Sequence, residues 1–339
     1  MPGIREVAEQ AGVSSATVSN VLNRPEIVAE ATRLRVQAVI ERLGFIRNGS
    51  AYQLRAGRSN HLGLVVLDMT NPFFTEVARG VEDAANEAGY LVTLCNSDNA
   101  PEKERRYLHM LQEQRAAGIL ITPVQDDIAY LQLLCQQKMA VVLLDRPSRA
   151  QNHCSVAIDD VLGGELALNH LLELGHRRIA FVSAPLSLCQ YAERYQGVRR
   201  AIQRAGLDPD DVICDIFVPF PNTFSGEQCV ETILTTTDRP TAIFCVNDLL
   251  ALGVMRGLSL RGMHIPKDIA LIGYDDVAFA GMLSPALTSI RQPKYQLGRA
   301  AAELLLHEIG EAGKHQHTQI VYQPELIVRH STMPLPAQP

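Results

Sequence analysis

The feature that most constrains the fold is a regular alternation, from residue 61 onward, of two kinds of segment. One kind is a short run of apolar, often β-branched residues, and the other has apolar residues at helical spacing. Runs that are apolar throughout are typical of parallel strands with helices on both faces. Nine or more such strands predict either two doubly wound lobes or a single barrel. The strand-like runs are 62–67, 91–95, 118–121, 141–144, 156–158, 179–182, 213–218, 242–246 and 269–272, and helical patterns include 74–88, 162–174, 197–205 and 249–260.

The residues before this region have a different pattern, that of three short helices over 4–12, 15–23 and about 29–43. Ser14 stands where an N-cap of the second helix belongs, and Gly44 stands where the third helix should end. Short helices joined in this way are typical of a helix-turn-helix DNA reader.

Residues 47–60 contain too few apolar side chains to form a core. Ser50 could cap one or two helical turns over 51–56, before Gly57. A helix this short is marginal in water, because isolated helices need roughly 12–15 residues. We therefore expect a linker that becomes ordered only when something holds it.

The charge of the chain is unevenly divided between its parts. The net charge is −6 over 339 residues, which by itself argues against binding to nucleic acid. Residues 1–60, however, contain eight Arg and five Glu, a net charge of +3, and the remainder carries −9. A small basic head on an acidic body can bind phosphates while the body stays off the DNA.

Several function classes find no support in the sequence. No apolar run reaches the ~18 residues that span a bilayer, and the N-terminus lacks the apolar segment of a signal peptide, so we expect a cytoplasmic protein. The seven cysteines form no CxxC pair, which favours free thiols over disulfides or a metal site. His315 and His317 flank one Gln in a polar loop, where most such pairs are solvated. No GxGxxG follows the first strand, and Walker A, GxSxG and HExxH motifs are missing, so we expect neither an enzyme nor a bound cofactor or metal.

Many of these segments resemble, in the same order, those of the lactose-repressor/galactose-repressor family. The resemblance implies a helix-turn-helix head and an α/β body of periplasmic-binding-protein type, with two doubly wound parallel-sheet lobes, and on this ground we dismiss the barrel. The implied domains are a head over 1–46, a hinge helix or linker over 47–60 and a body over 61–339. Within the body, the N-lobe covers about 61–158 and 291–320, and the C-lobe covers about 159–290 and 321–339. The segments that carry the resemblance are 4–8, 11–23, 30–33, 43–45, 63–66, 71–74, 174–179, 247–248, 252–253, 272–275 and 287–293.

The resemblance also implies which residues contact DNA. Three of them occupy base-reading positions, where Asn20 can pair with adenine and Ala16 can touch a thymine methyl group. Asn20 stands where relatives often have Arg, which leaves the operator sequence open. The base-reading set is Ser15, Ala16 and Asn20, and the phosphate contacts, some of which can also cap the helix, are Ser14, Thr17, Ser19, Asn23 and Arg33.

In the linker, the resemblance assigns a role to Leu54, an apolar residue that has no structural purpose on a solvated short helix. Two Leu54 side chains of a homodimer would wedge together into the minor groove at the operator centre and kink it. Arg55 would then lie near phosphate.

Polar and aromatic side chains follow several predicted strands, at the edge where open α/β sheets bind ligands. Planar hydrogen-bonding groups suit vicinal hydroxyls, and aromatic faces suit the C–H surfaces of a sugar ring. Each residue alone also has a structural explanation, but the full set resembles that of ribose-type binding proteins and ribose repressors. It implies a pentose, most simply D-ribose, sandwiched by Phe73 and Phe74, with a polar contact from Asn71 and hydroxyl contacts from Asp145, Arg146, Arg194, Asn247, Asp275 and Gln292.

The sequence thus predicts a homodimeric repressor that binds double-stranded operator DNA and is released by a monosaccharide. An alternative keeps the DNA function and reverses the effect of the small molecule on operator affinity. In it, a nucleobase or other metabolite acts as corepressor and tightens binding. Leu188 and Gln190 place no cation before Arg194, which makes an anionic or nucleobase corepressor less attractive. A further alternative is an enzyme or a transport binding protein with the same body, which would need a catalytic motif or a signal peptide.

Overall fold

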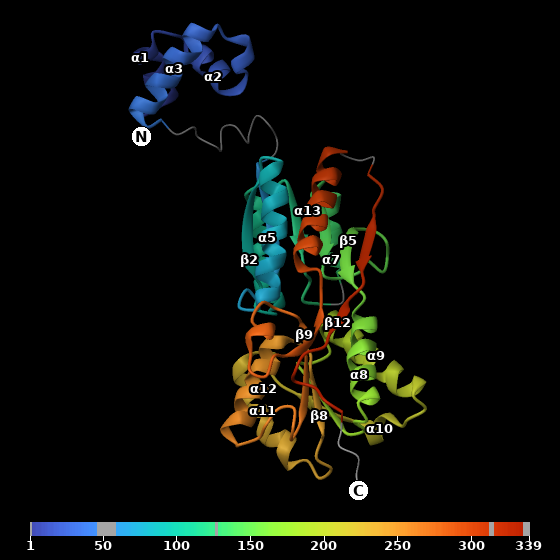
Figure 1. Cartoon of the computed structure of the whole chain (residues 1–339). Helices are drawn as coiled ribbons and strands as arrows, with labels where there is room; N and C mark the ends of the chain where they lie inside the picture. The colour runs from blue at the N-terminus through green and yellow to red at the C-terminus, as the bar shows by residue number, and fades with distance from the viewer. Residues whose placement is uncertain (1, 46–58, 126–127, 312–314, 335–339) are drawn as a thin grey trace. The chain divides into compact units, whose positions relative to one another are not determined.

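The computed structural model describes residues 2–45, 59–125, 128–311 and 315–334. The chain forms two units, residues 1–59 and residues 60–339 (Figure 1). No helix within the described ranges is long and apolar enough to cross a membrane.

The N-terminal unit consists of three helices, α1 (Ile4–Ala11), α2 (Ser15–Asn23) and α3 (Glu30–Leu43), together with a 3-10 turn, η1 (Pro25–Ile27). Helices α1 and α3 end where Gly12 and Gly44 adopt φ angles of 63° and 59°, in the left-handed region that favours glycine. Ser14 caps α2, because its hydroxyl accepts a hydrogen bond from the backbone N–H of Thr17 at 3.1 Å. The three predicted helices are thus confirmed, whereas the sequence pattern did not indicate η1.

All three helices contribute to the core of this unit, which is small and built mainly of valine and alanine. Small side chains let short helices approach closely and exclude water from their contact. The buried residues are Val7, Ala8 and Ala11 of α1, Val18 and Val21 of α2, and Val36 and Val39 of α3.

The C-terminal unit contains two six-stranded sheets and is therefore two lobes and not a barrel. The N-lobe sheet has the order β11-β5-β4-β3-β1-β2, and all its neighbouring strands are parallel. The C-lobe sheet has the order β12-β10-β9-β8-β6-β7, and among its described pairs β12 with β10 is the antiparallel one. The strands are β1 (His61–Val66), β2 (Leu91–Asn96), β3 (Gly118–Ile121), β4 (Ala140–Leu144), β5 (Cys154–Ile158), β6 (Ile179–Ser183), β7 (Ile213–Phe217), β8 (Ala242–Cys245), β9 (Ala270–Asp275), β10 (Thr288–Arg291), β11 (Gln319–Tyr322) and β12 (Glu325–Ile327).

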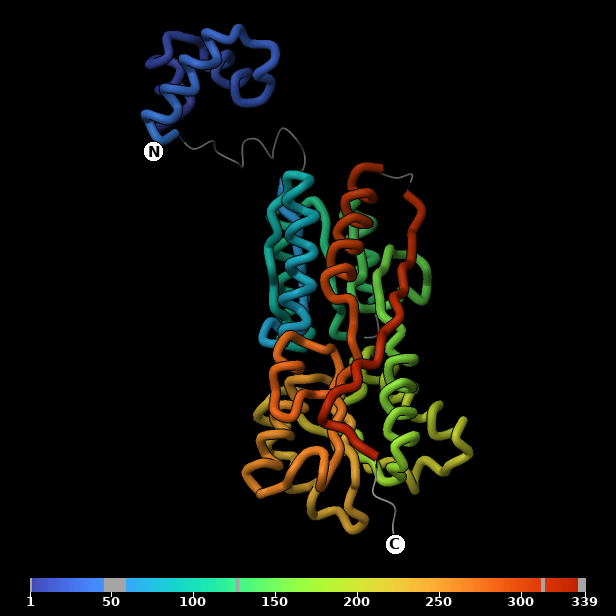
Figure 2. Tube along the Cα trace, viewed as in Figure 1, coloured from blue at the N-terminus to red at the C-terminus, as the bar shows by residue number. Residues whose placement is uncertain are grey.

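Helices cover both faces of each sheet, as continuous apolar strands require. The buried residues of α5 and α13 form one cluster with the N-lobe sheet, and those of α6 and α7 form a second cluster with it. Figure 2 traces the same path along the chain. The helices are α5 (Pro72–Glu87), α6 (Pro101–Glu113), α7 (Ala129–Gln136) and α13 (Lys294–Gly310) in the N-lobe, and α8 (Asp160–Glu173), α9 (Cys189–Arg204), α10 (Pro209–Val212), α11 (Thr223–Thr235), α12 (Asp248–Leu260) and the 3-10 turn η2 (Ala280–Met282) in the C-lobe.

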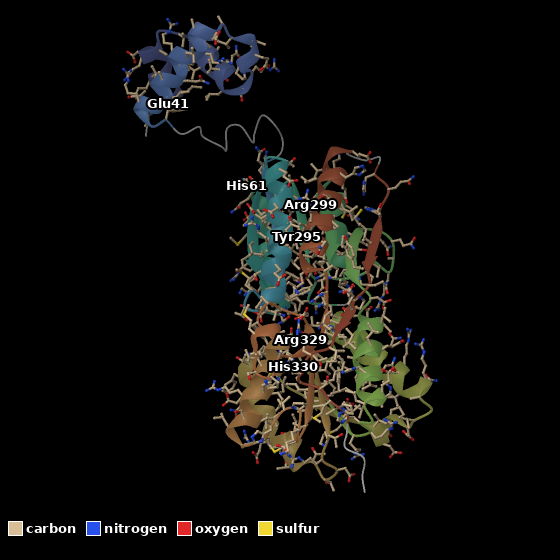
Figure 3. The ribbon with its side chains drawn as sticks, viewed as in Figure 1. Glu41, His61, Tyr295, Arg299, Arg329 and His330 are labelled. Carbon is tan, nitrogen blue, oxygen red and sulfur yellow. The ribbon has the colours of Figure 1, made fainter. Side chains whose placement is uncertain are left out.

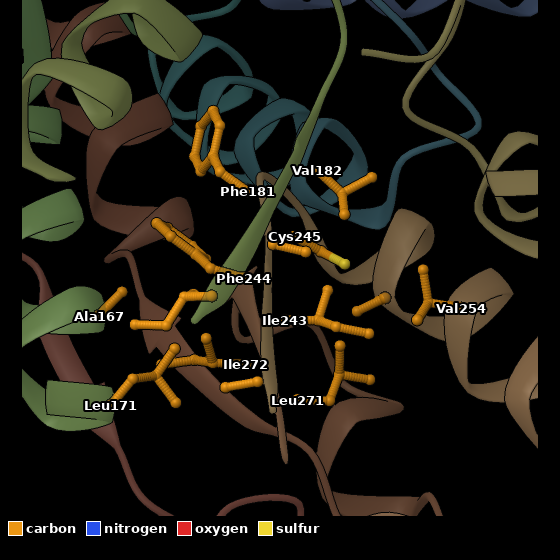
Figure 4. Close-up of a cluster of buried hydrophobic side chains, with 14 of the residues drawn as sticks. Ala167, Leu171, Phe181, Val182, Ile243, Phe244, Cys245, Val254, Leu271 and Ile272 are labelled. Carbon is orange, nitrogen blue, oxygen red and sulfur yellow. The ribbon is translucent and has the colours of Figure 1, made fainter. Parts of the chain in front are cut away.

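In the C-lobe, successive residues of one strand point to opposite faces of the sheet (Figure 4). Phe244 lies on the same side as Leu171 of α8, whereas Ile243 lies on the side of Val254 of α12. The two halves of the core therefore come from alternate residues of the same buried strands, and the sheet has no solvent-facing side at this point.

The chain crosses between the lobes three times. The crossings lie between β5 and α8, between β10 and α13, and between β11 and β12. The last crossing falls between Tyr322 and Glu325, slightly later than the expected boundary at about residue 320, because β11 pairs with β5 of the N-lobe through Tyr322.

Within each lobe, pairs of neighbouring helices meet at glycines. A Cβ atom added to Gly298 of α13 would lie 2.0 Å from the Val77 carbonyl oxygen of α5, and one added to Gly80 would lie 2.1 Å from the Tyr295 carbonyl oxygen. Tyr295 and Arg299 (Figure 3) also hold these helices, because their side chains donate hydrogen bonds to carboxylates of α5. The pairs α8–α9 and α11–α12 meet in the same way, at Gly164 with Gly197 and at Gly226 with Gly253.

Candidate functional site

The exposed face of α2 carries the residues expected to read bases. Ser15, Ala16 and Asn20 are all exposed, while Val18 and Val21 on the opposite face are buried. The N-terminal turn of α2 therefore presents short or polar side chains with free access to a groove, as base reading requires.

The residues expected at phosphates are all at least partly accessible. Ser14 and Asn23 are exposed, and Thr17, Ser19 and Arg33 are partly buried. Asn23 Nδ2 donates to the Ser19 carbonyl oxygen at 2.7 Å and to Ser19 Oγ at 3.2 Å, so these two side chains also stabilise the end of α2. Leu54 and Arg55 lie outside the described residues.

A cavity lies between the lobes of the C-terminal unit, at the carboxyl ends of β1, β4, β8 and β9. The space not filled by atoms in it, with the open solvent at its mouth included, is about 310 Å³. Seven of the nine residues expected to bind the effector line it, namely Asn71, Phe73, Phe74, Asp145, Arg194, Asn247 and Asp275. The other wall residues are Leu67, Gln190 and Tyr191.

Asp275 is at the centre of the polar wall. Its side chain is buried, and it accepts hydrogen bonds from Asn71 Nδ2 at 3.1 Å and from Gln292 Nε2 at 2.7 Å. Lys294 Nζ donates to its backbone oxygen at 2.9 Å. Burial raises the pKa of Asp275 to about 6, against the opposing effects of the Arg194 charge and the Asn71 hydrogen bond.

Asp145 faces Asp275 from the other lobe. Gln190 Nε2 donates to its backbone oxygen at 2.7 Å and to its carboxylate at 3.3 Å. Burial, and next the nearby Asp160 charge, raise the pKa of Asp145 well above its ordinary value. Asp145 Oδ1 and Gln190 Oε1 are buried and have no hydrogen-bond partner among the described residues. Because such orphaned acceptors are costly, the cavity is suited to a ligand that donates hydrogen bonds.

Arg194 has its hydrogen-bonding groups largely engaged by the protein. Its Nε donates to Asp160 Oδ1 at 2.8 Å and its Nη1 to the Val246 carbonyl oxygen at 2.6 Å. Its guanidinium lies 3.7 Å from the centre of the Tyr274 ring. Burial alone would lower the pKa of Arg194, but the Asp160 and Tyr274 groups keep it above its ordinary value.

Backbone positions fix the remaining wall residues. Asn71 and Asn247 cap α5 and α12, because their side-chain oxygens accept from Phe73 N at 3.0 Å and from Leu250 N at 2.8 Å. Asn247 Nδ2 is also engaged, by the Pro221 carbonyl oxygen at 3.0 Å. The strand-end residues Asp145 and Asp275 have φ angles of 54° and 104°, an uncommon conformation that aims them into the cleft.

The rings of Phe73 and Phe74 are not placed for a sandwich around one ligand. Their centres are 5.0 Å apart and their planes meet at 84°, so the two rings contact each other edge to face. Phe73 and Phe74 follow one another at the start of α5, and both belong to the N-lobe core.

Two expected effector residues lie outside the wall. Arg146 Nη1 donates to the Gln125 carbonyl oxygen, and Gln292 acts through its hydrogen bond to Asp275. Conversely, Gln190 and Tyr191 were not expected in the wall. They lie in the first turn of α9, and in the sequence Gln190 stands out only for its lack of charge. The signal that could have identified them is their position one helical turn before Arg194, itself an expected effector residue.

Two pairs of wall residues are hydrogen-bonded from one lobe to the other. Asn71 of the N-lobe donates to Asp275 of the C-lobe, and Gln190 of the C-lobe donates to the backbone and side-chain oxygens of Asp145 of the N-lobe. A ligand in the cavity would therefore contact the same groups that hold the lobes together.

Comparison with known proteins gives consistent matches along the whole chain. Residues 3–48 match the family described as bacterial regulatory proteins, lacI family, and residues 168–332 match the periplasmic binding protein-like domain. The chain is 35% identical over 338 residues to the HTH-type transcriptional repressor PurR of Histophilus somni, covering 99% of this chain and 100% of the relative.

Two solved structures resemble it as well. One is a LacI family transcriptional regulator from Enterococcus faecium with bound ribose, at 32% identity and a TM-score of 0.74, covering 81% of this chain and 99% of that one. The other is the Lac repressor dimer bound to operator and the anti-inducer ONPF, at 26% identity and a TM-score of 0.84, covering 98% of this chain and 99% of that one.

Proposed function

The chain belongs to the lacI family of bacterial regulatory proteins and is a DNA-binding transcriptional repressor, and we propose that a small molecule bound between its body lobes controls its affinity for the operator. The observation that carries this proposal is the cavity between the lobes, with its orphaned acceptors on Asp145 and Gln190. A ligand with donor groups would replace the missing hydrogen bonds and bias the arrangement of the lobes.

We propose further that the repressor acts as a homodimer on a pseudo-palindromic operator. The resemblance to the Lac repressor dimer bound to operator supports this assembly. Two α2 helices would then enter successive major grooves, about one helical turn apart. Each α2 would read bases with Ser15, Ala16 and Asn20, which are exposed on its outer face.

Two effector classes remain to be distinguished. The relatives named PurR match over their full length and favour the corepressor alternative, a purine, over the sugar predicted from the sequence. A nucleobase offers ring N–H donors to the orphaned acceptors and a face to the Tyr191 or Phe73 ring. We propose this class as the better supported one.

The sugar remains the second candidate because of specific observations in the cavity. Its wall has unpartnered hydrogen-bond acceptors on Asp145 and Gln190, and these suit the hydroxyl groups of a sugar. The main candidate donor, Arg194, is already hydrogen-bonded to Asp160 and Val246. The similar regulator from Enterococcus faecium was solved with bound ribose. The edge-to-face contact of Phe73 with Phe74, however, does not favour the predicted sandwich around a sugar ring.

Calorimetry with purines, D-ribose, other pentoses and hexoses separates the two classes. The ligand that binds is then added to an operator-binding assay, where a corepressor increases operator affinity and an inducer decreases it. Binding of none of these compounds, or binding that leaves operator affinity unchanged, would contradict control through this cavity.

The DNA-reading role is tested by two substitutions, one expected to change base preference and the other to change affinity on every sequence. Asn20→Ala should relax base preference at one position of each half-site, at a cost of about 1–3 kcal/mol. Arg33→Ala should weaken binding about equally on all sequences and reduce the salt dependence. Gln37→Ala, at an exposed position of α3, is the matched control and should change neither. Retention of wild-type specificity in Asn20→Ala would contradict the assigned role.

The linker is tested in the same assay. Leu54→Ala should weaken operator binding with little effect on the thermal stability of the body, because the proposed wedge acts only on DNA. Wild-type operator affinity in this variant would overturn the linker proposal.

A further inference from the structure

A group of sulfur, nitrogen and oxygen ligands lies in the N-lobe, away from the cavity between the lobes. Its members are Cys154, Glu308, His315 and His317, whose ligand atoms all lie within 4.8 Å of one another. They come from three separate segments, the start of β5, the last turns of α13 and the residues just before β11. The fold therefore brings together side chains that are up to 163 positions apart.

His315 is central to this group. Its Nε2 lies 2.9 Å from Cys154 Sγ and 4.0 Å from Glu308 Oε2, and its side chain is only 6% exposed. The expectation of a solvated His pair is therefore wrong for His315, because the end of α13 and the start of β5 cover it. His317 is exposed, and its ring centre lies 5.6 Å from that of His315.

Glu308 supplies a second, independent observation. Its Oε2 atom is buried and has no hydrogen-bond partner among the described residues. A buried, unpartnered carboxylate oxygen is unfavourable unless something positive compensates for it. Among the described ion pairs, its partner is His315, whose Nε2 lies 4.0 Å away.

The other nitrogen of His315 faces groups that could orient the ring. Nδ1 lies 3.2 Å from His307 Nδ1 and 3.7 Å from a Glu311 carboxylate oxygen. Metal-binding histidines usually have such a partner at the second nitrogen, which fixes the tautomer and the direction of the ring. The arrangement leaves Nε2 directed at Cys154 and Glu308.

We propose that Cys154, Glu308, His315 and His317 bind one Zn²⁺ ion. One thiolate, two imidazoles and one carboxylate form a four-ligand set of the kind that Zn²⁺ accepts in tetrahedral geometry. Ligands at 2.0–2.3 Å from a central zinc are roughly 3–4 Å apart, so small side-chain rotations would complete the site. On binding, the Cys154 thiol loses its proton to solvent and the sulfur bonds to the metal.

The position of the site in the fold suggests what the metal would do. Strands β1, β5 and β11 are parallel members of one sheet, so their amino ends lie on the same side of it. The site is therefore at the same end of the sheet as His61 (Figure 3), where β1 begins. Zinc would join the end of α13 to β5 and to the segment that enters β11. It would thus stabilise the N-lobe at the amino ends of its strands, whereas the effector cavity lies at their carboxyl ends.

The full-length protein, freed of metal with a chelator, is titrated with Zn²⁺ in competition with a chromophoric chelator, and separately with Co²⁺. We expect one Zn²⁺ per chain, a thermal midpoint that rises with zinc, and a thiolate-to-cobalt charge-transfer band. Cys154→Ser should abolish that band. His317→Gln, at an exposed position, should lower zinc affinity by more than the ~10–100-fold that loss of an outer partner causes.

Two matched variants provide the control. Cys95→Ser and His109→Gln lie in the same lobe but outside the four ligands, and both should bind zinc like the wild type. Circular dichroism establishes that each variant is folded. The proposal is overturned if zinc does not bind stoichiometrically, if folded Cys154→Ser and His317→Gln bind as tightly as the wild type, or if only His307→Gln reduces binding.

Discussion

Asp275 shows how much a single residue can do in this protein. It ends β9, holds an uncommon φ angle of 104°, and accepts hydrogen bonds from both the N-lobe residue Asn71 and the crossing residue Gln292. Its position at the end of a buried apolar run identifies it from the sequence. The bond to Asn71 has no sequence signal, since those two residues are 204 positions apart.

The raised pKa of Asp275 predicts a pH-dependent effector affinity. A ligand that donates a hydrogen bond needs the ionised carboxylate, and the pKa of about 6 means that the free protein takes up a proton below this pH. Effector affinity should therefore fall by up to about tenfold per pH unit as the pH drops below 6 and Asp275 takes up its proton. The charged groups that act on Asp275 are Arg194, Lys294, Asp160, Asp145 and Asp248.

Calorimetry from about pH 5 to about pH 8 with the purine or ribose that binds tests this expectation. Asp275→Asn should bind weakly and lose the transition near pH 6, whereas Asp145→Asn should keep a transition that moves to lower pH, because one neighbouring carboxylate is removed. A transition that persists in Asp275→Asn would assign the titration to another group.

At the scale of elements, the sequence predicted the first nine strands of the body better than the last three. The runs for β1 to β9 are mostly apolar, including those of the edge strands β2 and β7, and such runs are typical of parallel strands. Strands β10, β11 and β12 are short and contain polar residues, such as Thr288, Arg291 and Gln319, so periodicity alone does not identify them. They form because a neighbouring strand of the sheet is available to pair with them.

The same reasoning explains why Gln190, Tyr191 and the environment of His315 were missed. Their local sequence is compatible with a helix start or a polar loop. Only the packing of distant segments places Gln190 against Asp145 and His315 against Cys154.

The glycine contact between α5 and α13 leads to a stability prediction. Gly298→Ala should lower the free energy of unfolding by at least about 2 kcal/mol, because the new methyl group would meet the Val77 carbonyl oxygen at 2.0 Å. Gly310→Ala, in the same helix and with no atom within 4 Å, should be neutral or stabilising by up to about 1 kcal/mol. Urea unfolding of both variants measures the difference, and equal stabilities would contradict the proposed close contact.

At the scale of the whole molecule, DNA binding and effector binding must be coupled reciprocally. If the effector changes operator affinity by some factor, saturating operator DNA must change effector affinity by the same factor and in the same direction. Calorimetry of the effector with and without operator, compared with operator titrations with and without effector, checks this equality. Unequal factors would mean that the two measurements involve different binding sites or different oligomers.

The basic head predicts a strong salt dependence for the same equilibrium. Residues 1–60 carry the net positive charge, while the rest of the chain is acidic. The logarithm of operator affinity should fall linearly with the logarithm of salt concentration, with a slope of about −0.9 for each phosphate contact. A slope near zero would contradict phosphate binding by the head.

The glycine contacts within each lobe also have a mechanical consequence. Helices whose backbones approach closely at Gly80 and Gly298, or at Gly164 and Gly197, leave no room for a side chain at those points. We therefore expect each lobe to be stiff and the compliance of the body to be concentrated in its three short crossings. Substitutions among the polar residues of the cavity wall could consequently adapt the protein to a new ligand. They would leave the stiffness of the lobes unchanged, and with it the motion that the ligand controls.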